Sequence, residues 1–237
     1  MATPADVAAF RAVQADVVTL ALAELAQWWE ELLALLTGDV PVGQIEAFIA
    51  DLVAVYGDAA ALSAVDWYDE LREQADVRGR FRAVMAEPAP REQAAAVARW
   101  AVGSLFGAQP DPATSLGHLS GGVQRLVLQP GRQTIATSVD EDPADARWAR
   151  VPSGPTTCAF CRLLASRGAV YHSEESAGGL ATSFHSLCDC VPTPVWPGEQ
   201  EPYDVDALVD EYSNARAEAG GNPKAILAQM RKDLGIN

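Results

Sequence analysis

The chain has 237 residues, of which 49% are apolar, and this is enough to bury a core as one large domain or two small ones. With 32 acidic and 17 basic residues the formal net charge is −15, which argues against a general phosphate-binding surface and against strong nucleic-acid binding. No run of 18 apolar residues occurs, so the sequence predicts no membrane span.

The first third of the chain is predicted to be helical. Apolar residues recur at intervals of three to five over residues 4–36, which predicts one long amphipathic helix. A second helix is predicted over residues 45–56, with Gly57 as a kink or stop. A third is predicted over residues 59–85, broken near Gly79.

Helices are also predicted in the middle of the chain. Residues 91–106 carry an apolar stripe at helical spacing, and residues 107–112 have the composition of a linker. Residues 116–128 are expected to form another helix. Pro130 is well placed to begin a separate short helix that runs to residue 139.

The character of the sequence changes after an acidic turn at residues 140–145. Short strands are predicted over residues 147–151, 168–171 and 190–196, and the prolines of the last confine it to a sheet edge or an extended arm. Residues 158–165 are predicted to form a knuckle that leads into a helical turn. The acidic tail should form two helices, over residues 204–219 and from the Asn222-Pro223 pair to residue 234.

All four cysteines and one of the three histidines fall in a single motif, C-x2-C, then 23 residues, then H-x2-C-x-C. Two thiols separated by two residues can face one ion from a tight turn, and the downstream group supplies a second donor pair. The motif therefore predicts a Zn²⁺ site. Its candidate ligands are Cys158, Cys161, His185, Cys188 and Cys190.

Tetrahedral zinc takes four ligands, so one of these five candidates must be left over. Cys188 and Cys190 alternate like neighbours on an extended segment, so their side chains should point to opposite faces unless the backbone turns between them. We therefore expect Cys188, Cys190 or His185 to lie outside the ligand set.

Three other uses of the cysteines compete with zinc. Two disulfides would suit a secreted protein, but residues 1–10 contain no basic segment followed by an apolar one, so a reducing compartment is expected. A redox C-x-x-C normally opens a helix in a βαβ unit and needs no second Cys/His group. The cysteines could also be unligated small apolar residues.

A zinc ion held mainly by thiolates is a poor Lewis acid, so the composition of the motif favours a structural site over a catalytic one. The deaminase pattern H-x-E followed by P-C-x-x-C is absent from the sequence. Asp189 is interpreted as a solvated turn residue, and His118 and His172 as surface or core histidines without a catalytic role. No catalytic residue and no organic cofactor is predicted.

The middle of the chain has no acidic excess, since residues 88–150 carry 6 acidic and 6 basic residues. Contact with an acidic polymer or a carboxylate-rich partner would therefore involve Arg125, Arg132, Arg147 or Arg150. The alternative is that these are ordinary solvated arginines.

These features predict a mainly α fold in three parts. Residues 1–107 form a helical N-terminal region, residues 112–197 a small loop-rich α+β module stapled by zinc, and residues 198–237 a helical acidic tail. A module with so few aliphatic residues needs a bound metal ion to be stable.

Three segments carry a resemblance to a known family: W-A-R-V-P at residues 148–152, T-C-A-F-C-R-L-L-A-S-R-G-A-V-Y at residues 157–171, and F-H-S-L-C-D-C-V-P-T-P-V at residues 184–195. They resemble the phage head-morphogenesis family typified by the Mu F protein, and more narrowly the MuF-like minor capsid proteins of actinobacterial tailed phages. The five candidate ligands and Gly168 occupy marked positions of that family. Ser186 and Asp189 stand where it has proline and arginine.

The resemblance implies a non-enzymatic virion protein that associates with the portal and the major capsid protein. It would lie in the capsid interior near the portal vertex after being made in the host cytoplasm. About 40 residues follow the matching segment, and because a catalytic domain usually needs more, we expect no fused catalytic domain. Two alternatives stay open: a zinc-dependent hydrolase or nuclease with His185 or His172 as base, and a zinc-bearing interaction adaptor.

Overall fold

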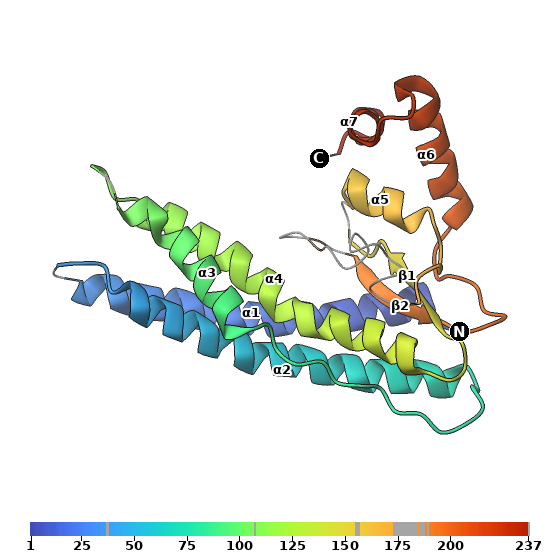
Figure 1. The fold of residues 1–237 in the computed structure, drawn as a ribbon, viewed down its shortest axis with the longest axis horizontal. Helices are drawn as coiled ribbons and strands as arrows, with labels where there is room; N and C mark the ends of the chain where they lie inside the picture. The colour runs from blue at the N-terminus through green and yellow to red at the C-terminus, as the bar shows by residue number, and fades with distance from the viewer. Residues whose placement is uncertain are drawn as a thin grey trace.

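The computed structural model describes residues 1–36, 38–106, 108–154, 157–172, 184, 188 and 190–236. The fold is mainly α-helical, as expected: a bundle of long helices comes first, a small α+β module lies on one end of it, and two helices of the C-terminal tail stack beyond the module (Figure 1). The cysteine cluster lies within the module.

The bundle contains helices α1 (Pro4–Leu35), α2 (Val42–Gln74), α3 (Arg91–Ala101) and α4 (Pro112–Glu141), and α3 continues into the short 3₁₀ helix η1 (Val102–Leu105). Helix α1 confirms the predicted long first helix. It begins with a capping box, in which Thr3 Oγ1 accepts from the Asp6 amide and the Asp6 carboxylate accepts from the Thr3 amide. Helix α2 packs against α1, α3 and α4, so it is the central helix of the bundle.

Two predicted helix boundaries were wrong, and both lie where α2 crosses α4. Helix α2 runs through Gly57, and α4 runs through Pro130. A Cβ on Gly57 would lie only 3.2 Å from Pro130 Cγ, and a Cβ on Gly131 only 2.9 Å from the Ala60 carbonyl oxygen. These residues let the helices approach closely. The predicted third helix over residues 59–85 was also wrong, because its helical part belongs to α2 and ends at Gln74.

Helix α2 is, within the described residues, long and apolar enough to cross a membrane by length and composition alone, with a mean hydropathy of 1.6 over an 18-residue window. The structure buries 44% of that window. The buried residues include Ile49, Val53 and Ala60, each with no exposed surface. A central bundle helix has this composition, and the absence of a membrane span stays a prediction.

The module contains an antiparallel sheet of two strands, β1 (Arg147–Val151) and β2 (Val191–Val195), within the described part of the chain. In its register Trp148 lies opposite Pro194 and Arg150 opposite Pro192. The predicted strand over residues 168–171 is reduced to one bridge between Trp148 and Tyr171. Both strands are almost fully buried because the sheet packs against α4.

Three further helices complete the described chain: α5 (Ala159–Ala165), α6 (Val205–Ala219) and α7 (Pro223–Leu234). The two tail helices confirm the prediction, with Asp204 and Asn222 as their N-caps. Helices α5, α6 and α7 share a small apolar core of their own. Its buried residues are Ala159, Ala215, Ile226 and Met230.

The sheet joins the bundle through a larger shared core and one buried polar junction. The core combines side chains of α1, α2 and α4 with those of both strands. At the junction Asp142, the C-cap of α4, accepts from Arg72 Nε at 2.9 Å, Tyr68 Oη at 3.0 Å and Trp196 Nε1 at 3.1 Å. The Asp142 side chain has no exposed surface, so this carboxylate ties α2 and the end of β2 to α4.

The predicted division into residues 1–107, 112–197 and 198–237 stays a prediction. Its first boundary falls between η1 and α4. Helix α4 packs along α2 in the bundle and also contacts both strands of the module. The helix therefore belongs by contact to both regions.

Candidate metal centre

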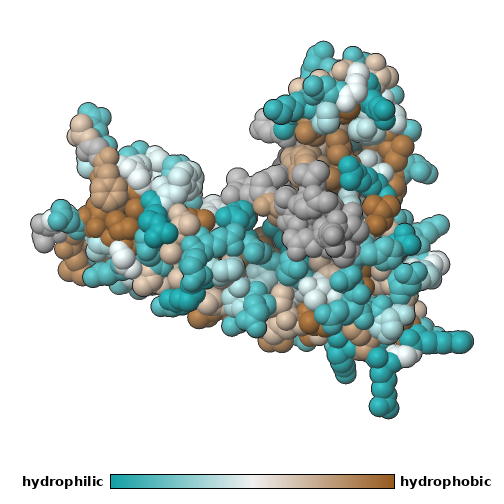
Figure 2. All heavy atoms as spheres, viewed as in Figure 1, coloured by the Kyte–Doolittle hydropathy of each residue, from teal (hydrophilic) through white to brown (hydrophobic). Residues whose placement is uncertain are grey.

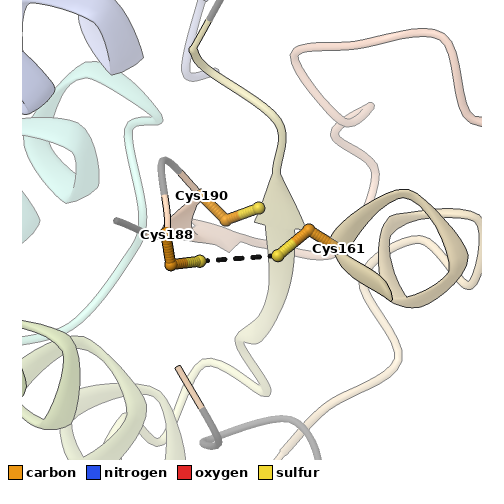
Figure 3. Close-up of side chains that lie close together, drawn as sticks. All are labelled: Cys161, Cys188 and Cys190. Carbon is orange, nitrogen blue, oxygen red and sulfur yellow. Dashed lines mark hydrogen bonds between the residues drawn. The ribbon is translucent and has the colours of Figure 1, made fainter. Parts of the chain in front are cut away.

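The cysteines come from two segments that the fold brings together. Cys158 is the N-cap of α5 and Cys161 lies in its first turn, whereas Cys188 and Cys190 directly precede β2. The sulfurs of Cys161, Cys188 and Cys190 all lie within 4.8 Å of one another, and all three residues are buried (Figure 3). The spacing of the motif therefore predicted a real spatial cluster.

The geometry of this cluster fits a tetrahedral thiolate site. Zn–S bonds of about 2.3 Å place two sulfurs of such a site about 3.8 Å apart. The Sγ atoms of Cys161 and Cys188 are 3.4 Å apart, far longer than a disulfide bond, and none of the four cysteines is in a disulfide. The identity of the ion as Zn²⁺ stays a prediction.

Cys158 lies beside this cluster of three sulfurs but is not one of the three that lie within 4.8 Å of one another. It is half-buried and packs against the other three cysteines. His185, the fifth candidate, lies outside the described residues, as does Asp189. The structure thus brings three of the five predicted ligand sulfurs together and packs Cys158 against them.

The expected opposition of Cys188 and Cys190 does not occur. Residues two apart on an extended strand point to opposite faces. Both sulfurs nevertheless lie in the same cluster with Cys161 (Figure 3). The two cysteines precede β2, so the alternation of side-chain directions along a strand does not apply to them. Neither cysteine can be set aside from the ligand set on this ground.

The cluster favours a shared negative charge. Hydrogen bonds from the thiols of Cys161 and Cys190 lower the pKa of Cys188, and the positive charge of Arg132 lowers it further, whereas burial opposes this shift. Hydrogen bonding to Cys158, Cys188 and Cys190, together with burial, raises the pKa of Cys161. A lowered pKa favours the thiolate form of Cys188, and a thiolate is the form that binds a metal.

Two arginines and a phenylalanine surround the cluster, and their role was not predicted. The guanidinium carbon of Arg132 lies 4.0 Å from the centroid of the Phe184 ring, and that of Arg150 lies 3.7 Å from it. Arg132 Nη2 also donates to the Cys188 carbonyl oxygen at 3.1 Å. Arg150 is completely buried, so it is not the solvated or partner-binding residue expected from the sequence.

The remaining candidates lie elsewhere. His118 stacks on Trp100, with ring centroids 4.5 Å apart, at the bundle surface. His172 Nδ1 lies 3.9 Å from a carboxylate oxygen of Asp145, and both side chains are well exposed. No cluster of three or more metal-binding side chains other than the cysteines occurs among the residues described.

The comparison with protein families gives one match, and it covers most of the chain. The model of the family described as VG15 protein matches residues 1–215, a span that includes the bundle, the module and all five candidate ligands. The chain belongs to the VG15 protein family. No solved structure matches this VG15 chain.

Two curated relatives are phage proteins. The chain is 27% identical to the gene 15 protein of Mycobacterium phage L5, over 72% of this chain and 72% of the relative. It is 33% identical to the gene 15 protein of Mycobacterium phage D29, over 32% of this chain and 40% of the relative. The match thus spans less than half of the D29 protein and nearly three quarters of the L5 protein. Neither relative is named as an enzyme.

Proposed function

We propose that this VG15 protein is a non-enzymatic structural component of a tailed-phage particle, a minor capsid protein of the MuF type that acts in head morphogenesis. It would be made in the host cytoplasm and lie inside the capsid near the portal vertex. Its partners would be the portal protein and the major capsid protein. The similarity to gene 15 proteins of two mycobacteriophages supports the phage assignment.

The observation that carries a structural role is the buried cysteine cluster. Cys161 belongs to α5, which packs in the core of the tail helices, whereas Cys188 and Cys190 lead into β2, which packs in the core of the bundle. An ion held by these thiolates would join the two cores. A site so rich in sulfur would be a poor Lewis acid, which favours a structural Zn²⁺ over a hydrolase or nuclease centre.

The end of the bundle farthest from the module supports a docking role. Apolar side chains gather on the surface there (Figure 2). Leu35 and Phe106, which flank the two loops at this end, are 79% and 59% exposed. Patches of this kind on a folded chain commonly mark protein interaction sites. We assign this end of the bundle to the portal contact.

Co-expression of the chain with the portal protein and the major capsid protein of the same phage tests the proposal. Co-purification with the portal is expected, and Leu35→Glu with Phe106→Glu should abolish it. Val55→Glu is the matched control, since Val55 is 65% exposed on the side of α2. Absence of the chain from purified particles, or equal loss of binding in the control, would contradict the proposal.

A second test concerns nucleic acid. A chain with a net charge of −15 should not bind duplex DNA tightly at about 150 mM salt, because few phosphates could be neutralised. Fluorescence anisotropy with a labelled duplex measures this directly. Tight binding at that salt concentration would favour a nuclease or packaging role over the structural one.

A further inference from the structure

The cysteine cluster lies beside two arginine guanidinium groups that are partly or fully buried. Arg150 is fully buried, and Arg132 is half-buried. Both guanidinium groups lie over the ring of Phe184, so they are close to each other as well. Two like charges this close and this dehydrated are strongly unfavourable unless negative charge lies next to them.

The nearby sulfurs can supply that negative charge. Arg132 donates to the carbonyl oxygen of Cys188. The ring of Phe184, over which both guanidinium groups lie, packs against the cysteine cluster. Each arginine therefore lies beside the cysteine cluster. The cations and the sulfurs form one electrostatic unit.

The balance of charge distinguishes the possible ligand sets. A divalent ion bound by three thiolates and a neutral imidazole leaves one negative charge in excess, whereas four thiolates leave two. Two guanidinium groups match the second case. Cys158 packs against the three clustered cysteines, so a fourth sulfur lies beside them.

We infer that the site is a four-thiolate centre of Cys158, Cys161, Cys188 and Cys190, and that Arg132 and Arg150 are positioning residues that neutralise its two excess negative charges. The inference rests on the structural metal site proposed above. It assigns His185 a place outside the ligand set. It also explains why two arginines are stacked on one aromatic ring beside the cluster.

Thiol counting on the metal-loaded full chain tests the ligand set without a mutation. All four thiols should be protected from a thiol reagent, and all four should react after chelation. The Co²⁺-substituted chain should show charge-transfer absorption of four-thiolate intensity. His185→Ala should keep both properties, whereas Cys158→Ser should lose stoichiometric metal. Three protected thiols, or metal lost from His185→Ala and kept by Cys158→Ser, overturn the inference.

Competition with a zinc-binding dye tests the role of the arginines. Arg132→Met should weaken zinc binding by about 10- to 100-fold, the range found for residues that support metal ligands. Arg132→Lys should recover most of that loss because it keeps the charge. Arg125→Met is the matched control, because Arg125 lies about two turns before Arg132 on α4. Equal affinities of Arg132→Met and Arg125→Met overturn the charge role.

The two levels of the proposal fail differently. A wild-type chain that retains no ion and leaves four reactive thiols overturns the metal site and the inference together. A bound ion with three protected thiols overturns the inference alone and leaves the structural site intact. Arg150→Met serves as a second probe of charge only if circular dichroism shows native helicity, and Arg132→Met decides the question in either case.

Discussion

The bundle and the module are stabilised in different ways. Helices of about 30 residues pack along their whole length in the bundle, and an uninterrupted set of buried apolar side chains runs between them. The module has two strands of five residues and one helix of seven, so it has few apolar contacts of its own. The bundle should fold on burial alone. The module should need its cysteine cluster, and the experiments below are ordered by how strongly they separate the two regions.

Metal removal should have the largest effect and should act on the module. Apparent binding free energies of structural zinc sites are on the order of 10–16 kcal/mol, and a chain that holds zinc at this cluster would lose this contribution on chelation or in Cys161→Ser. Hydrogen exchange followed by mass spectrometry should show faster exchange in β1, α5 and β2 and unchanged protection in α1 and α2. Val170→Ala, an exposed position in the same module, is the control. Loss of protection across the whole bundle would show that the two regions do not fold separately.

The junction at Asp142 should give the next largest effect, and here both regions should respond together. Asp142→Asn leaves the buried Arg72 without its counter-charge, and removal of one partner from a buried ion pair costs about 3–5 kcal/mol. Urea unfolding measures the loss. Asp140→Asn is the matched control because Asp140 is exposed on the same helix. A loss below about 1 kcal/mol would mean that the junction is not a structural link.

Acid should weaken the same junction. Burial alone would raise the pKa of Asp142, but hydrogen bonds from Arg72, Ala144, Trp196 and Tyr68 lower it below its ordinary value. A carboxyl group with a lowered folded pKa stabilises the fold fully above its unfolded pKa of about 3.9, and this contribution is lost as pH falls through the folded pKa. The difference in urea midpoint between wild type and Asp142→Asn should therefore shrink below about pH 4. A constant difference down to pH 3 would contradict the assignment.

The crossing of α2 and α4 should respond next, as a property of the bundle only. Gly131→Ala would place a Cβ 2.9 Å from the Ala60 carbonyl oxygen, which cannot move without displacing α2. Overpacking of this kind costs about 1–3 kcal/mol. Gly117→Ala, on the same helix with no atom within 4 Å of the added Cβ, should be neutral or stabilising. The melting temperatures of both variants should be compared by thermal unfolding. Equal melting temperatures would contradict a close approach of α2 and α4 at Gly131.

This crossing also shows where prediction from sequence failed. Periodicity located the helices well, since the ends of α1, α6 and α7 fall within a residue or two of expectation. Gly57 and Pro130 were interpreted as local breaks, yet they are contact residues of a tertiary interface. Local propensity carries no information about a partner helix far away in sequence, and packing decided the outcome.

Three of the five predicted donors, Cys161, Cys188 and Cys190, lie in one cluster, whereas the residues around the cluster were not predictable from the sequence. Two cysteine pairs and a histidine in a spaced motif indicate a cluster because each pair can face one ion from a turn. Arginine, however, is usually exposed, so no local sequence pattern predicted that Arg150 would be buried. Its burial follows from the register that sets it opposite Pro192 in a sheet covered by α4. Strand register and burial depend on contacts between segments that are far apart in the sequence, so a local pattern does not predict them.

The smallest effect should come from a helix cap and should again separate the regions. Asn222 caps α7 by accepting from the amides of Lys224 and Ala225, and its replacement by alanine costs about 1 kcal/mol. Helix α7 has only two buried side chains, so Asn222→Ala should speed hydrogen exchange in α7 without moving the urea midpoint of the bundle. Thr3→Ala removes a similar cap from α1, which buries seven side chains, and should move that midpoint instead. If both variants shift the midpoint equally, the tail is as firmly part of the cooperative unit as the bundle, and the two regions unfold as one.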